Sequence, residues 1–192
     1  RVRLADLVAR REDLVAAIQA ERNRLGTSRD GWVRREIQRL VAILEDHLKA
    51  VEKEIARHIA ASGSLLEQAR RLRTAPGIGP ALVAVILARL PELGRLKAKQ
   101  IAALAGLAPQ ACDSGLYRGK RRVWGGRADI RRALYLAGFV ASRFDPTLAA
   151  FRARLQELGK PPKLAITACA RKLLTIINAM ARDATDYASA VS

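Results

Sequence analysis

Apolar residues in the first third of the chain recur at helical spacing. Between Leu4 and Leu25 they repeat at intervals of three, four and seven, with charged residues between them, and a second such stripe runs from Val33 to Ile59 without Gly or Pro. Each stripe is typical of an amphipathic helix. The segment 26–31 between them holds two glycines and three side chains able to cap a helix, which predicts a turn. We therefore expect a long antiparallel helical hairpin.

The seam of this predicted hairpin resembles coiled-coil packing, although Arg11 and His47 fall at seam positions. Its apolar stripes are longer than the rest of the chain could cover, so they would leave a large apolar surface in water. Association with a second copy competes here with folding within one chain. We expect a homo-oligomer, a dimer or a larger assembly.

The composition changes at residues 61–64, where a basic second unit begins. We place the domain boundary near Gly63, which gives a hairpin of residues 1–62 and a second unit of residues 63–192. Periodicity with proline and glycine signals predicts helices over 80–90, 97–105, 129–143, 146–158 and 162–182. Because aromatic residues make up only 4% of the chain, we expect an all-α fold, the hairpin followed by a compact helical domain.

The charge balance points to a polyanionic partner. Lys and Arg number 35 against 18 Asp and Glu, a formal charge of +17, and nucleic acid is the polyanion this favours. The alternative is a generally basic composition with no such partner. No apolar run reaches about 18 residues and no signal peptide precedes the first helix, so we expect a cytoplasmic, nucleoid-associated bacterial protein that does not enter a membrane.

The thiols and imidazoles suggest no metal site. Cys112 and Cys169 are isolated, and His47 and His58 lie eleven positions apart, too far along a helix to share one ion. We therefore expect neither a metal nor a cofactor in this chain.

A glycine-rich turn is the first candidate contact with nucleic acid. The segment Pro76-Gly77-Ile78-Gly79-Pro80, followed by an apolar run, resembles the helix-hairpin-helix motif of DNA-binding proteins. Glycines let a backbone approach a phosphate, and the N–H groups at the start of the next helix bind the anion. Gly77, Ile78 and Gly79 are accordingly predicted to bind nucleic-acid backbone. The alternative is a tight turn without a ligand.

The second candidate lies in the stretch between residues 105 and 129, which lacks helical periodicity. It contains Ser114. We predict that the basic residues within and just after this stretch contact phosphates: Arg118, Lys120, Arg121, Arg122, Arg127, Arg131 and Arg132. A serine attacks phosphorus only where a base takes its proton and cations stabilise the developing charge. The arginines satisfy the second need; Asp113, a tyrosine or another domain could satisfy the first. From the residues alone, a serine that only forms part of a turn, beside basic residues that contact phosphates, is commoner than a nucleophilic serine.

Several segments, in a fixed order, resemble one family. They are Pro76–Pro80, Leu104–Pro109, Asp113–Gly115, Arg131–Tyr135, Leu158–Lys163 and Ala170–Leu174. Together they are similar to the insertion-sequence transposases that join an N-terminal resolvase-like domain of four acidic residues to a C-terminal serine domain, and that carry out bridge-RNA-guided recombination. The resemblance covers about residues 65–182.

This resemblance implies a DNA strand-exchange enzyme in which Ser114 bonds covalently to DNA and the acidic domain binds a divalent metal, magnesium. DNA would be its partner, with a structured guide RNA. Where many members have Ile-Ser-Lys-Arg-Gly, this chain has Val123-Trp124-Gly125-Gly126-Arg127, a departure that leaves the roles of those positions open.

The four carboxylates of the resolvase-like domain have no counterpart here, and the chain begins with Arg1 rather than Met. We therefore expect a C-terminal fragment that is inactive alone. Two alternatives are a non-catalytic nucleic-acid-binding module with a helix-hairpin-helix, and a unit that serves only oligomerisation.

Overall fold

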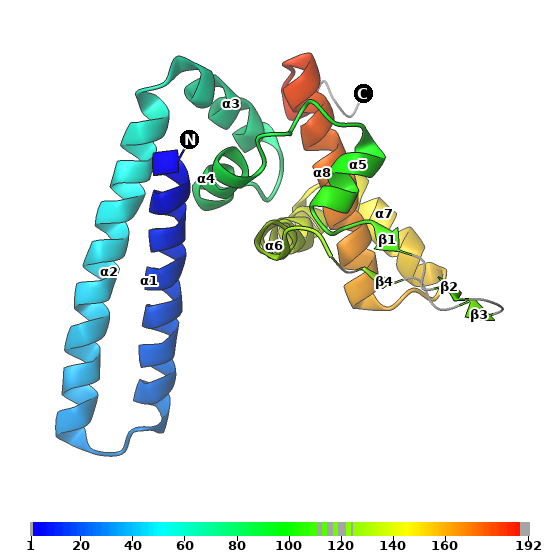
Figure 1. The fold of residues 1–192 in the computed structure, drawn as a ribbon. Coiled ribbons are helices and arrows are strands. Elements are labelled where there is room, and N and C mark those ends of the chain that lie inside the picture. Colours follow the sequence, from blue (N-terminus) through cyan, green and yellow to red (C-terminus); the bar gives the residue numbers. More distant parts are fainter. Residues whose placement is uncertain (1, 111–112, 115–116, 119–121, 124, 189–192) are drawn as a thin grey trace. The chain divides into compact units, whose positions relative to one another are not determined.

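The computed structural model describes residues 2–110, 113–114, 117–118, 122–123 and 125–188 (Figure 1). These residues form eight helices and four strands of two residues each, so the expectation of an all-α protein is confirmed. The chain divides into two compact units, Arg1–Leu66 and Glu67–Ser192, which are described separately.

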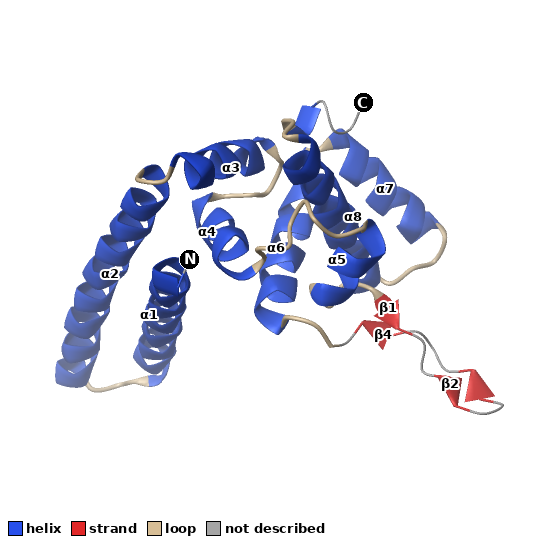
Figure 2. Cartoon of the chain, turned by 45° about the horizontal axis from the view of Figure 1, so that its top comes forward, coloured by secondary structure: helices blue, strands red, loops and turns tan. Residues whose placement is uncertain are grey.

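The first unit is a pair of antiparallel helices, α1 (Val2–Thr27) and α2 (Gly31–Ala60), which lie side by side in Figures 1 and 2. The buried residues of α1 are Leu4, Val8, Leu14 and Ile18, which belong to its predicted stripe. Arg11, placed at a seam position by the sequence, forms an ion pair with Glu52 of α2 at 2.8 Å. The predicted helical hairpin is therefore present.

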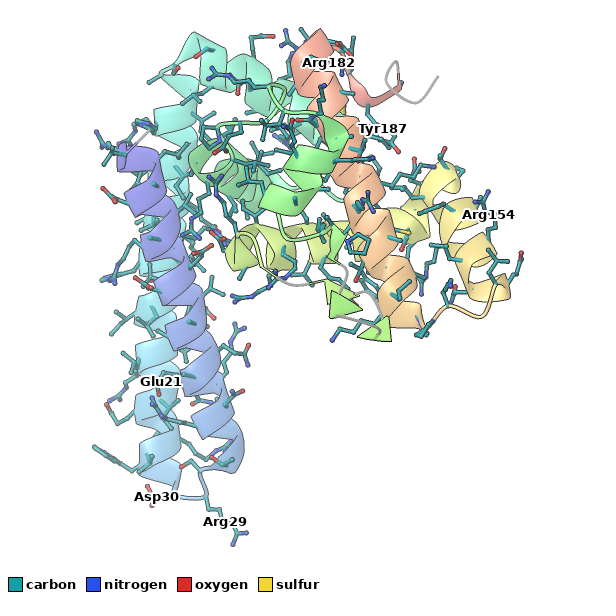
Figure 3. The ribbon with its side chains drawn as sticks, turned by 45° about the vertical axis from the view of Figure 1, so that its right-hand side comes forward. Glu21, Arg29, Asp30, Arg154, Arg182 and Tyr187 are labelled. Atoms are coloured by element: carbon teal, nitrogen blue, oxygen red, sulfur yellow. The ribbon has the colours of Figure 1, made fainter. Side chains whose placement is uncertain are left out.

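The turn between α1 and α2 is fixed at both helix ends. Asp30 caps α2, because its carboxylate accepts a hydrogen bond from the N–H of Val33 at 2.8 Å. Arg34 reaches back and donates to the carbonyls of Leu25 and Ser28, at 2.7 and 2.9 Å. These carbonyls lie at the end of α1, where a helix leaves its last acceptors unsatisfied. Figure 3 shows Asp30 at this turn.

Six further helices follow along the chain. They are α3 (Gly63–Thr74), which crosses the division between the units, α4 (Pro80–Arg89), α5 (Ala98–Leu104), α6 (Ala128–Phe144), α7 (Pro146–Glu157) and α8 (Pro162–Asp183). Asp145 caps α7 by accepting from the N–H of Leu148, with Pro146 in the first turn as the sequence predicted.

Helix α8 is central to the second unit, since α5, α6 and α7 all pack against it. Its buried residues include Cys169, Leu173, Leu174 and Ile177, each 0% exposed. By length and composition α8 would pass as a membrane span, but half of that window is buried inside the structure. A core helix passes the same test, so this gives no argument for a membrane.

Between α5 and α6 the chain forms two short antiparallel pairs. Strand β1 (Pro109–Gln110) pairs with β4 (Arg122–Val123), and β2 (Asp113–Ser114) pairs with β3 (Tyr117–Arg118). Figure 2 shows these strands in red, with β1 and β4 nearer the helices of their unit than the pair of β2 and β3. They occupy the stretch in which the sequence predicted no helix.

Candidate nucleic-acid interface and serine loop

The glycine-rich turn joins α3 to α4, and its first glycine packs on a helix backbone. Gly77 has φ +75°, and a Cβ added there would stand 2.5 Å from the carbonyl oxygen of Ala137 in α6. Ile78 is only 5% exposed and belongs to the core. Close packing within the protein therefore explains glycine at position 77 and an apolar residue at position 78 without a ligand.

Gly79 is in a different environment. It is the exposed N-cap of α4, its φ is an ordinary −87°, and no atom lies within 4 Å of the place where a Cβ would stand. The first N–H groups of a helix have no acceptor within it and carry the positive end of its dipole. Within the turn, the open space at Gly79 is where an anion would have access to those groups. The predicted phosphate contacts of this turn stay a prediction.

Ser114 lies in β2, with Tyr117 of β3 as its backbone partner, and Asp113 pairs with Arg118 in the same way. Residues 115–116 connect the two strands. The side chains of residues 110–124 lie outside the described part of the structure, as do Lys120, Arg121 and Cys112 as a whole. The assignment of Ser114 as nucleophile, and of Arg118, Lys120, Arg121 and Arg122 as phosphate contacts, is therefore untested.

The two ends of this stretch meet in a direct backbone contact. Gly106 and Gly126 have φ values of +64° and +63°, and a Cβ on Gly126 would stand 2.3 Å from the backbone nitrogen of Gly106. The N–H of Arg127 donates to the carbonyl of Leu104 at 2.9 Å. Only glycine permits both the positive φ and this approach. We call residues 104–110, 122–123 and 125–127 the loop base.

Arg127, predicted to contact phosphates, is occupied by protein acceptors. Its Nη1 donates to Glu92 Oε2 at 2.8 Å and to the carbonyl of Arg89 at 2.6 Å, and its Nη2 donates to Glu92 Oε1 at 2.7 Å. The hydrogen bonds that Arg127 donates to Glu92 raise the pKa of Arg127, although burial opposes the shift. The guanidinium of Arg127 and the carboxylate of Glu92 form a bidentate ion pair, which fixes the orientation of both side chains.

A second ion pair lies beside the first. Arg89 Nη1 donates to Asp129 Oδ2, in the first turn of α6, at 2.5 Å. Burial alone would raise the pKa of Asp129, but the hydrogen bond from Arg89, backbone N–H groups at the start of α6 and the positive charge of Arg89 together outweigh it, so the pKa lies below its ordinary value. A carboxylate is also favoured at this helix N-terminus.

The last two predicted basic residues lie on α6. Arg131 donates to the carbonyl of Gly125 at 2.5 Å, whereas Arg132 is exposed. The structure thus brings Arg127 and Arg131 to the loop base, both bound to protein groups, and leaves Arg132 at the surface. Sequence reasoning missed Glu92 and Asn178, which support this arrangement; a lone Asn in the apolar pattern of α8 was the available signal.

In the described ranges, no group of three or more His, Cys, Asp or Glu side chains could hold a metal ion. The Cys169 thiol is buried, which raises its pKa. Neither observation assigns metal or thiol chemistry to the described residues.

Comparison with known proteins identifies a family pattern in the second unit. Residues 69–153 match the profile of the family described as "Transposase IS116/IS110/IS902 family". This segment includes the second half of α3, the glycine-rich turn, the loop base, Ser114, α6 and most of α7.

Three relatives illustrate the likeness. The chain is 32% identical over 120 residues to an "Insertion element IS110 uncharacterized 43.6 kDa protein" of Streptomyces coelicolor, covering 62% of this chain and 30% of the relative. It is 32% identical over 142 residues to a "Pilin gene-inverting protein" of Moraxella bovis, covering 71% and 44%. It is 32% identical over 157 residues to an "Insertion element IS900 uncharacterized 42 kDa protein" of Mycobacterium paratuberculosis, covering 77% and 39%. The chain therefore spans less than half the length of these relatives.

Proposed function

We propose that this chain is the C-terminal part of a transposase or site-specific DNA recombinase in which Ser114 attacks DNA. The observation that carries the proposal is the family match over residues 69–153, because it includes the Ser114 stretch and the elements that hold it. Two of the relatives are proteins of insertion elements and one is named for inverting a gene.

In the proposed reaction the hydroxyl of Ser114 attacks a DNA phosphorus atom. The bond from Oγ to phosphorus forms, the bond from phosphorus to the leaving sugar oxygen breaks, and that oxygen takes up a proton while the serine proton passes to a base. Attack by a second DNA hydroxyl on the serine–phosphate bond releases the serine and completes the exchange. Arg118, Lys120, Arg121 and Arg122 would stabilise the negative charge that develops at phosphorus.

Charge supports DNA as the substrate. Residues 67–192 contain 22 Lys and Arg against 8 Asp and Glu, an excess of 14, whereas residues 1–66 contain 13 against 10. The positive charge is therefore concentrated in the unit that carries Ser114, where phosphates would have to bind. A guide RNA and a second copy of the chain are further proposed partners.

A divalent metal, magnesium, would bind outside this chain in the proposed acidic N-terminal domain. The described carboxylates do not fit such an ion, because no suitable group of them occurs. On this proposal, strand exchange depends on the longer protein.

The test is covalent attachment of DNA to the longer protein that includes its N-terminal domain. Incubated with the ends of its own element, the wild type should form a denaturation-resistant protein–DNA complex, and Ser114→Ala should form none while binding DNA normally. Ser64→Ala, an exposed serine in α3, is the matched control and should behave as the wild type. Full strand exchange by Ser114→Ala would exclude Ser114 as the nucleophile.

A second candidate function is a non-catalytic nucleic-acid-binding module. The open N-terminus of α4 at Gly79 favours it, because this site could hold a phosphate without any chemistry at Ser114. Normal DNA binding together with unimpaired exchange by Ser114→Ala would favour this candidate.

A further inference from the structure

The loop base is closed by the backbone alone, before any side chain contributes. Gly106 lies against Gly125 and Gly126, the N–H of Arg127 bonds the carbonyl of Leu104, and β1 pairs with β4 just beyond. Both chain segments that lead to Ser114 thus leave from one point. Whatever fixes this point also fixes where the Ser114 stretch begins and ends.

Arg127 connects the loop base to a separate segment of the chain. Its three hydrogen bonds to Glu92 and to the carbonyl of Arg89 use three of the four hydrogens on its Nη atoms. Glu92 lies 35 positions earlier, in the turn between α4 and α5. Arg127 therefore links the position of the loop base to the position of this turn.

Asn178 of the core helix α8 holds this turn between α4 and α5 in place through two hydrogen bonds. This side chain is 3% exposed, its Oδ1 accepts from the N–H of Gly94 at 2.9 Å, and its Nδ2 donates to the carbonyl of Leu96 at 2.9 Å. Gly94 has φ +81°, and a Cβ there would stand 2.9 Å from the α8 backbone at Ala181. Both polar ends of the amide are satisfied, as a buried Asn requires.

We propose that Glu92, Asn178 and Arg127 are positioning residues that hold the loop base, and through it the Ser114 stretch, at a fixed place on the core. The proposal rests on the proposed function in giving Ser114 a reaction for which its position matters. It changes the interpretation of Arg127, from a phosphate contact to a residue bound within the protein. A reacting group needs such support, because a displacement of about 1 Å lowers a rate about 100-fold.

The first test needs no activity and uses the full 192-residue chain. Amide hydrogen exchange is measured at Arg127, whose N–H bonds Leu104, and at Leu174 in the core of α8, in the wild type, in Glu92→Gln and in the control Glu157→Gln. In Glu92→Gln the Arg127 amide should exchange at least about tenfold faster while Leu174 is unchanged, since only the loop base loosens. Unchanged exchange at Arg127 would overturn the proposal.

Asn178→Leu should loosen the same amide, but it buries two unsatisfied backbone groups and can prevent folding. Glu92→Gln keeps the shape of the side chain and leaves the core intact. The Glu92→Gln variant therefore tests the proposal whether or not Asn178→Leu folds.

The second test separates positioning from phosphate contact. If Arg127 contacted phosphate, Arg127→Lys would keep DNA affinity and strand exchange, and Glu92→Gln would raise affinity by releasing the guanidinium. If Arg127 positions the loop base, both variants should keep DNA affinity within about twofold, while the first-order rate of covalent attachment at saturating DNA falls about 10- to 100-fold. Raised affinity in Glu92→Gln with a wild-type rate would overturn the proposal.

The two proposals fail in different ways. If DNA still became covalently attached to the Ser114→Ala variant, Ser114 would not be the nucleophile. The hydrogen-exchange result at the Arg127 amide would still stand. If the Arg127 amide of the Glu92→Gln variant exchanged hydrogen at the wild-type rate, the proposed positioning role would be refuted. This would hold even if Ser114→Ala abolished covalent attachment of DNA.

Discussion

Gly77 and Gly79 lie two positions apart in one turn, yet different physical constraints act on them. Gly77 has a positive φ and lies against the backbone of α6, whereas Gly79 has an ordinary φ and open space around it. A side chain at position 77 would meet atoms that cannot move without shifting a helix. A side chain at position 79 would extend into solvent, across the first N–H groups of α4.

The two substitutions are therefore expected to separate stability from binding. Gly77→Ala should lower the free energy of unfolding by about 2–4 kcal/mol, from the positive φ together with the overlap on Ala137. Gly79→Ala should change it by less than about 1 kcal/mol. Urea denaturation measures both, and equal losses would contradict the packing explanation of Gly77.

Gly79→Leu should keep most of the stability and weaken DNA binding without a preference for sequence, because it screens backbone N–H groups that read no bases. Fluorescence anisotropy with two unrelated duplexes measures this. If Gly79→Leu left the DNA affinity unchanged, the N-terminus of α4 would not be part of the nucleic-acid interface.

The sequence indicates which residues form elements far better than it indicates which side chains pair. Arginine at position 127 has the same local pattern as its basic neighbours, and only the fold brings Glu92 within reach of it. Asn178 stood out as a lone polar residue in the apolar pattern of α8, but only the fold shows that its partners are the backbone groups of the turn at 94–96. Such partners lie 35 or more positions apart, where no local rule applies.

At the scale of elements, proline and glycine signals located the boundaries of α7 and α8 to within one residue. Helix α8 was predicted over 162–182 and spans Pro162–Asp183, and α7 was predicted over 146–158 and spans Pro146–Glu157. Both helices begin with a proline in the first turn, and α7 is also capped by Asp145, so these starts depend on signals within one turn. No helix was predicted over residues 63–74, where α3 lies, because this charged sequence carries few apolar residues.

The hairpin unit leaves apolar side chains in water along α2. Trp32 is 64% exposed, Leu40 42% and Ile43 55%. A surface of this kind favours association, and the predicted partner is a second copy.

We predict that the chain forms a dimer or a larger assembly at micromolar concentration, which light scattering would detect as a multiple of 21.0 kDa. Leu40→Glu with Ile43→Glu should yield the single-chain mass, since two charges would have to enter the interface. The control Gln38→Glu, at an exposed polar position of α2, should leave the assembly intact. A single-chain mass for the wild type would refute the prediction.

At the scale of the whole molecule, charge divides unequally between the units. The hairpin is nearly balanced, and several of its arginines pair across the helices, as Arg3 does with Glu54 and Arg22 with Glu45. The second unit carries most of the excess. DNA affinity should therefore depend on salt through residues of the second unit.

We predict a log–log slope of DNA affinity against salt of about −5 for a protein that neutralises about six phosphates. Arg132→Gln, which removes an exposed charge of α6, should make the slope shallower by about 0.9. Lys53→Gln, in the hairpin, should leave it unchanged. Affinity insensitive to salt would exclude binding through phosphates.

The contact between Gly106 and Gly126 has a consequence for how such proteins diversify. Because the two ends of the stretch already touch, its interior can lengthen without moving the helices on either side. Doubling the length of a flexible loop costs only about 0.6 kcal/mol in closure entropy. We therefore expect that a longer segment can replace the residues between Gln110 and Arg122 while the rest of the fold stays the same.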